Sequence, residues 1–152
     1  MSNNFDFEDS IFGNDPFPLD RYVRWQYYTY QDAMNEMRMG FRKGHWVPYI
    51  FPQLAGVGIS AAEKKYALRS VYEANEFLRH PVLGQRLREI TRAVLALYKK
   101  PDQIFGSSYA QQFYASMTLF ACLSNDGSIF HQVLNQYYYG KMDETTLKVM
   151  AK

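Results

Sequence analysis

The most constraining feature of this sequence is the spacing of its apolar residues, which repeats with the period of an α-helix. Two stretches place apolar side chains at successive steps of 4, 3, 4 and 3 residues: Val23, Tyr27, Tyr30, Met34 and Met37, and then Leu83, Leu87, Ile90, Val94 and Leu97. Such steps gather side chains on one face of a helix. No stretch keeps the alternation of apolar and polar residues expected of a β-strand. We therefore predict an all-α fold.

Capping and breaking residues divide the chain into about five to seven helices, packed as a compact bundle. The sequences Ser60-x-x-Glu63 and Ser70-x-x-Glu73 are capping boxes, and each predicts the start of a short helix. Pro81 is expected in the first turn of the helix that carries Leu83 to Leu97. A later helix should bury Phe113, Met117, Phe120 and Leu123, and two more should begin at Ser128 and Asp143.

Residues 41–59 do not fit a long helix. Gly44, Pro48, Pro52, Gly56 and Gly58 lie there among bulky aromatic residues, and proline and glycine disfavour a helix interior. We expect a packed aromatic loop after the first long helix, which should run from Asp20 to Gly40.

The 152 residues correspond to one domain of ordinary size, but their charge is uneven. Residues 1–20 contain five acidic side chains and no Lys or Arg, whereas residues 21–152 carry a net charge of +7. We expect residues 1–18 to form a flexible acidic arm and residues 19–152 a single helical domain. An acidic arm can also fold back over a cationic surface.

The lone cysteine, Cys122, excludes an intramolecular disulfide and is expected to be a small buried apolar residue. No apolar run reaches the ~20 residues of a membrane span, and the N-terminus has no secretory pattern. The three histidines lack the i, i+4 spacing of a zinc helix, so we predict no metal site and no cofactor. A cytoplasmic protein without a membrane partner is expected.

Several blocks of residues resemble one known family. They are Arg42-Lys43-Gly44-His45-Trp46, Ile50-Phe51-Pro52-Gln53, His80-Pro81-x-Leu83-Gly84-x-Arg86-Leu87, Ile104-Phe105-Gly106 and Ser116-Met117-Thr118-Leu119-Phe120. Their order is similar to that of the uncharacterised bacterial family called domain of unknown function 1810. The resemblance runs from about Leu19 to near the C-terminus, and it implies a compact all-helical fold and no established activity. Pro48 and Tyr109-Ala110-Gln111-Gln112 depart from the family pattern.

The aromatic loop holds the first candidate site. His45 follows a basic pair and precedes Trp46, and Gln53 lies eight residues further on. In one interpretation His45 is an acid, base or donor, Trp46 an aromatic wall and Gln53 an orienting amide of a ligand pocket. In the other, the aromatic residues belong to the core and His45 lies at its edge.

Two further segments carry candidate binding residues. The turn with Gly56 and Gly58 leads into Ser60, where free amides at a helix start can hold an anion, although a glycine turn followed by a serine cap explains the same pattern. His80 precedes a helix that carries Arg86, so His80 can act as a base and Arg86 as an anion clamp. Capping by His80 and an ion pair between Arg86 and Glu89 explain these residues equally well.

None of these motifs specifies a reaction, so the sequence leaves open whether the protein is an enzyme. The first hypothesis is a ligand-binding protein or enzyme for a small anionic or nucleotide-like molecule. Its pocket would lie between the loop of residues 45–60 and the helix that starts at Pro81. The second is a protein-interaction module that uses Tyr137 to Tyr139. Nucleic-acid binding is a weaker third hypothesis, because the Lys and Arg residues are spread along the chain.

Overall fold

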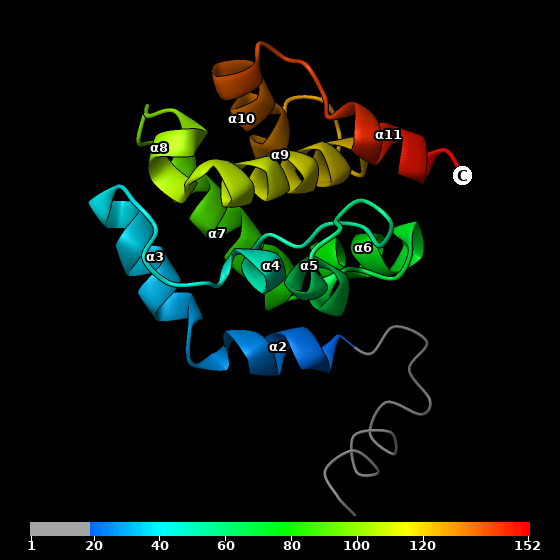
Figure 1. Ribbon diagram of the computed structural model, residues 1–152, viewed down its shortest axis with the longest axis horizontal. Coiled ribbons are helices and arrows are strands. Elements are labelled where there is room, and N and C mark those ends of the chain that lie inside the picture. Colours follow the sequence, from blue (N-terminus) through cyan, green and yellow to red (C-terminus); the bar gives the residue numbers. More distant parts are fainter. Residues whose placement is uncertain (1–18) are drawn as a thin grey trace, which may run out of the picture.

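Helices make up most of residues 19–152, the part of the chain described in the computed structural model (Figure 1). They are α2 (Asp20–Tyr27), α3 (Tyr30–Met39), α4 (Val47–Ile50), α5 (Ala61–Tyr66), α6 (Val71–Arg79), α7 (Leu83–Leu95), α8 (Pro101–Phe105), α9 (Ser107–Cys122), α10 (Ile129–Tyr138) and α11 (Glu144–Met150). Within this range no strand forms, and one isolated bridge pairs Leu54 with Leu68. The predicted all-α class is confirmed. The acidic arm of residues 1–18 lies outside the described residues.

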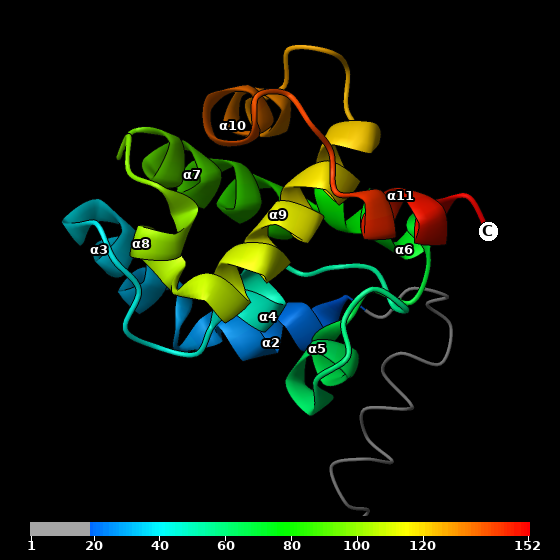
Figure 2. The ribbon, with the colours of Figure 1, turned by 45° about the horizontal axis from the view of Figure 1, so that its top comes forward.

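Helix α9 runs through the middle of the molecule and is buried on most of its surface (Figure 2). It contacts α4, α6, α8, α10 and α11. Its predicted apolar face is buried at Phe113, Met117 and Phe120, and the opposite face is also covered, since Gln112 and Thr118 are buried. A helix surrounded in this way organises one continuous core.

The helix starts predicted from capping residues are confirmed. The side chains of Ser60, Ser70, Ser128 and Asp143 each accept a hydrogen bond from the amide three residues later, at distances of 3.0, 3.0, 3.3 and 3.2 Å. The predicted face of α7 is confirmed at Leu83, Leu87, Ile90 and Val94, which are buried. The expected fifth position, Leu97, lies beyond the end of α7 and is half-buried. These features depend on neighbours within one or two turns, which the sequence displays directly.

The prediction of one long first helix is wrong. The helix breaks after α2, where the amide of Thr29 turns back to the carbonyl of Gln26 at 3.1 Å. The residues of α2 that face the core also differ from the predicted stripe, because Tyr22 and Gln26 are buried, whereas Tyr27 is 70 % exposed. The apolar stripe continues only on α3, where Met34 and Met37 are buried.

The predicted number of helices is too low, because residues 19–152 contain ten helices, seven of them with at least seven residues. Two of the additional helices are single turns with a proline near the start, α4 with Pro48 and α8 with Pro101. Proline is compatible with the first turn of a helix, where its missing N–H is not needed. The loop of residues 41–59 is packed as expected, with Trp46 and Phe51 buried on either side of α4.

A buried ion pair joins α2 to α6. Nη2 of Arg21 lies 2.6 Å from Oε1 of Glu73, whose side chain is 0 % exposed. The same Oε1 accepts the amide of Arg69 at 3.0 Å. Glu73 therefore departs from the predicted capping box, because its carboxylate binds a different amide and a distant guanidinium.

Candidate functional site

Trp46, predicted either as a ligand wall or as core, is buried and bonded to the end of α3. Its Nε1 donates to Oε1 of Glu36 at 2.8 Å, and the same oxygen accepts the amides of Lys43 and Gly44 at 2.7 and 3.0 Å. Burial favours the neutral acid, but these hydrogen bonds, led by those of Gly44 and Lys43, lower the pKa of Glu36. The Trp46 indole thus attaches the aromatic loop to α3.

His45 is exposed beside the start of α9. Its Nδ1 lies 3.1 Å from the hydroxyl oxygen of Tyr109, whose ring lies under the guanidinium of Arg42 at 4.5 Å. Arg42 in turn donates from Nε to the carbonyl of Phe105 at 2.8 Å. Arg42 of the basic pair before His45 therefore attaches the loop to α8 and α9.

The amides after the glycine turn are already used. Glu63 accepts the amides of Ile59 and Ser60 at 3.2 and 3.0 Å, which completes the capping box with the Ser60 hydroxyl. Nε2 of Gln53 donates to the same carboxylate at 2.9 Å. These bonds, with the Ser60 amide first, lower the pKa of Glu63 against the effect of burial. The turn therefore offers no free amide at Ile59 or Ser60 to a phosphate.

The local structure requires glycine at Gly56 and at Gly58 for different reasons. Gly56 has a φ of +98°, which favours glycine, whereas a Cβ on Gly58 would collide with the Gln53 amide. Gln53 and Gly58 also line a cavity of about 380 Å³ together with Glu63 and Asp143. Two carboxylates make this cavity unsuitable for an anion.

His80 and Arg86, predicted to act together, are held by different partners. Nδ1 of His80 accepts the amides of Val82 and Leu83 at 3.1 and 3.2 Å, so the neutral ring carries its proton on Nε2. Nη1 of Arg86 donates to Oε1 of Gln26 at 3.2 Å, and its guanidinium lies 5.2 Å from the Tyr30 ring. Arg86 thus connects α7 to α2 and α3.

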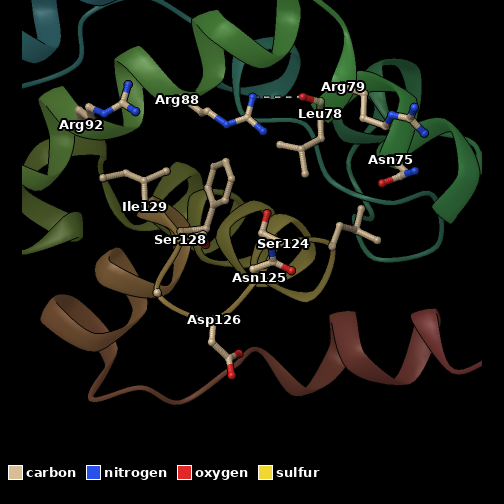
Figure 3. A pocket seen from close by; sticks show the side chains of 13 residues that line it. Asn75, Leu78, Arg79, Arg88, Arg92, Ser124, Asn125, Asp126, Ser128 and Ile129 are labelled. Carbon is tan, nitrogen blue, oxygen red and sulfur yellow. Dashed lines mark hydrogen bonds between the residues drawn. The ribbon is translucent and has the colours of Figure 1, made fainter.

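A cationic cleft lies between α6, α7 and the turn that joins α9 to α10 (Figure 3). One cavity of about 570 Å³ has Arg79, Arg88 and Arg92 on one side and Ser124, Asn125 and Ser128 on the other. A second cavity of about 540 Å³ shares the three arginines and adds His80, Pro81 and Gln85. We call the two cavities together the arginine cleft. His45 lines neither of them, so the two predicted histidines do not meet here.

Positive charge in the arginine cleft is poorly balanced. Nη1 of Arg88 donates to the carbonyl of Leu78 at 3.1 Å, whereas the side chains of Arg79 and Arg92 form no hydrogen bond or ion pair within residues 19–152. Asp126 borders the cleft, but its carboxylate points away from the arginines and lies 3.9 Å from Nε2 of His131. Three guanidinium groups therefore line a cleft, and no carboxylate of residues 19–152 is paired with them.

Sequence reasoning missed this combination. Arg88 and Arg92 are spaced i, i+4 and share a face of α7, which is a visible but common signal. Arg79 reaches the cleft from the end of α6, and Ser124, Asn125 and Ser128 reach it from more than thirty residues away. Their meeting depends on how α6, α7 and the α9–α10 turn pack.

Cys122 is exposed, so its expected burial is wrong. The residue follows the last fully buried turn of α9, and its Sγ lies 3.8 Å from Sδ of Met142. Partial desolvation of the sulfur raises the pKa of the thiol. A raised pKa reduces the thiolate fraction, which does not favour a nucleophile.

Comparison with known proteins identifies the family. A model of the family described as Protein of unknown function (DUF1810) matches residues 16–150. The chain belongs to this family. The chain is similar to the conserved hypothetical protein Rv1873 from Mycobacterium tuberculosis, whose crystal structure was determined at 1.38 Å. The two sequences are 37% identical, and the two structures superpose with a TM-score of 0.87 over 91% of this chain and 99% of that one. A search of curated proteins finds no match.

The family assignment confirms the resemblance found in the sequence and adds no reaction to it. Within residues 19–152, no group of three or more His, Cys, Asp or Glu side chains is placed to hold a metal ion. Over the same range, none of the helices combines the length and the apolar character needed to cross a bilayer.

Proposed function

We propose that this member of the DUF1810 family binds a small anionic molecule, with a phosphate or carboxylate group, in the arginine cleft. The observation that carries the proposal is the group formed by Arg79, Arg88 and Arg92, which has no paired carboxylate among residues 19–152. Like charges that share a cavity repel one another, and a bound anion removes that repulsion. A guanidinium also matches the geometry of a phosphate or carboxylate.

The surrounding groups support an anionic ligand. His80 keeps its proton on Nε2 because Nδ1 caps α7, so the ring is a donor while it is neutral. The hydroxyl of Ser128 caps α10 on the opposite wall, where the helix start favours negative charge. A nucleotide-like ligand, with a planar base beside its phosphates, is one molecule of this class. A cytoplasmic location belongs to the same proposal, and the lone Cys122 supports it.

Calorimetric titration with ADP, pyrophosphate and adenosine tests the proposal. We expect the two anions to bind and uncharged adenosine not to bind. The variants Arg79→Gln and Arg92→Gln should each weaken binding by about tenfold or more, since a hydrogen bond to a charged group contributes about 1.5–3 kcal/mol. The matched control is Arg38→Gln, because Arg38 is an exposed residue of α3 outside the cleft.

The variants should keep their stability without ligand. Neither Arg79 nor Arg92 bonds to another residue of the described chain, so we expect changes within about 0.5 kcal/mol in urea unfolding. The proposal fails if neither anion binds at low salt, or if Arg38→Gln weakens binding as much as the cleft variants do. Tight binding of an oligonucleotide, but of neither small anion, would also overturn it.

A further inference from the structure

Another cavity, separate from the arginine cleft, lies between α8, α9 and α10. Its volume is about 400 Å³, and four tyrosines contribute to its lining: Tyr114 of α9 and Tyr137, Tyr138 and Tyr139 at the end of α10. We call it the tyrosine cavity. It shares no lining residue with the arginine cleft, and two charged residues of the α8 start, Lys100 and Asp102, complete its rim.

Three tyrosines of this cavity, Tyr114, Tyr137 and Tyr138, are half-buried and held in place by neighbouring residues. The hydroxyl of Tyr114 donates to the carbonyl of Lys141 at 2.8 Å, and that of Tyr137 to the carbonyl of Val94 at 2.8 Å. The rings of Tyr114 and Tyr138 stack with centroids 4.0 Å apart and planes at 18°. These aromatic surfaces are therefore fixed before any ligand binds, which lowers the entropy cost of binding.

Two features of the tyrosine cavity are unfavourable for the stability of the fold. Tyr139 ends α10 in the left-handed region, with φ of 56°, and its side chain is 99 % exposed. Glycine is the usual residue at such a helix end, and a bulky residue there is strained. The hydroxyl of Tyr138 is buried and has no hydrogen-bond partner within residues 19–152. The strained backbone of Tyr139 and the Tyr138 hydroxyl, unpartnered among residues 19–152, thus lie at one cavity.

Carboxylates lie near the stacked rings, although Lys100 adds a positive charge to the rim. Burial is the main reason why the pKa of Tyr138 is raised, and the carboxylate of Asp102 raises it further. Burial also raises the pKa of Tyr114, with further contributions from Asp143 and Glu144. Asp102 forms no ion pair with another residue of the described chain. A cation in this cavity would meet tyrosine rings and a carboxylate that has no ion pair among residues 19–152.

We propose that the tyrosine cavity binds an organic cation, an alkylated ammonium group that contacts the tyrosine rings while Asp102 balances its charge. Aromatic faces attract a cation electrostatically, and tyrosine is among the best rings for this purpose. Ammonium groups with several methyl groups are weakly hydrated and fit an aromatic cage better than a small inorganic ion does. This site does not depend on the arginine cleft, which selects the opposite charge.

A titration with choline tests the site, and 3,3-dimethylbutan-1-ol is the control, because it has the same shape without the charge. Addition of choline should produce binding heat or chemical-shift changes. The alcohol should bind at least about tenfold more weakly, because it cannot form the cation–π contact. Asp102→Asn should weaken choline binding. Lys100→Gln should strengthen it, because that change removes a positive charge from the rim.

A matched pair of tyrosine variants separates the cavity from a general aromatic effect. Tyr139→Leu should weaken choline binding about fivefold or more. Tyr98→Leu should not, although Tyr98 also has a positive φ and is 78 % exposed, because it lies in the segment after α7 and does not line the cavity. Circular dichroism should show that both variants fold. The proposal is overturned if choline does not bind, if the alcohol binds equally well, or if Tyr98→Leu has the same effect as Tyr139→Leu.

Discussion

Removal of the Arg21 guanidinium tests how far the fold depends on one buried charge pair. Arg21 donates from Nη2 and Nη1 to the two carboxylate oxygens of Glu73, at 2.6 and 3.3 Å, and so ties α2 to α6. The side chain of Arg21 is 11 % exposed, and that of Glu73 is fully buried. In an Arg21→Met variant the apolar stem remains, but the Glu73 carboxylate keeps only the Arg69 amide as a donor among the bonds described.

The expected loss follows from that geometry. A buried charge that loses its partner costs about 3–5 kcal/mol, a large part of the roughly 5–15 kcal/mol by which a domain is stable. At about 2–4 °C per kcal/mol for a chain of this size, the melting temperature should fall by roughly 6–20 °C. The double variant Arg21→Met/Glu73→Met removes both charges. It should therefore be more stable than the sum of the single losses predicts, by about 2 kcal/mol or more.

Urea unfolding followed by tryptophan fluorescence measures these differences. Trp25 is a local probe, since its ring lies 5.9 Å from the Arg21 guanidinium carbon. The control Arg38→Met changes an exposed arginine of α3 and should alter the free energy of unfolding by less than about 0.5 kcal/mol. If the single losses of Arg21→Met and Glu73→Met add within about 0.5 kcal/mol in the double variant, the reasoning is refuted.

Two further substitutions test local packing and pH dependence. The folded pKa of Glu36 lies below its usual value of 4.5, so its stabilising effect is present above about pH 4.5 and is lost as the pH falls through the folded pKa. Glu36→Gln should therefore lower the urea midpoint at pH 6. Between pH 6 and pH 3 the variant should lose less stability than the wild type, and an equal loss of stability in both proteins would contradict this. A Cβ at Gly84 would collide with the carbonyl oxygen of Leu78 and approach Nη1 of Arg88. Gly84→Ala should thus destabilise the protein by about 1–3 kcal/mol and weaken anion binding, and unchanged melting and titration curves would contradict that expectation.

Much of the fold was predictable because its signals are local. The buried face of α7 and the starts of α5, α6, α10 and α11 follow from residues within a few positions of one another. The break between α2 and α3 was not predictable in this way. Tyr27 continues the helical spacing in sequence, yet α2 buries Tyr22 and Gln26 and leaves Tyr27 exposed, and the chain then turns at Thr29. Periodicity shows which residues can share a face, and packing decides whether the helix stays continuous.

The candidate site was less predictable than the fold. His80 lines the arginine cleft, but no residue of the 45–60 loop does, and the capping of α7 by His80 is the alternative that the sequence also offered. Arg86, the predicted anion clamp, binds Gln26 instead, while Arg88 and Arg92 of the same helix line the cleft. Side chains that are two or six residues apart on a helix point to different faces. Which arginine of α7 lines a cleft therefore depends on the helices that pack around α7.

By itself, the sequence determined the helical class, most helix starts and the family, because each of these depends on residue types at short or fixed spacings. Only the tertiary structure decided which charged and aromatic side chains share a cavity. Arg79 meets Arg92 because α6 packs against α7, and Tyr114 meets Tyr138 because α10 packs against α9. These juxtapositions of side chains depend on how the apolar faces of distant helices are buried against one another, which the order of residues in the chain does not show.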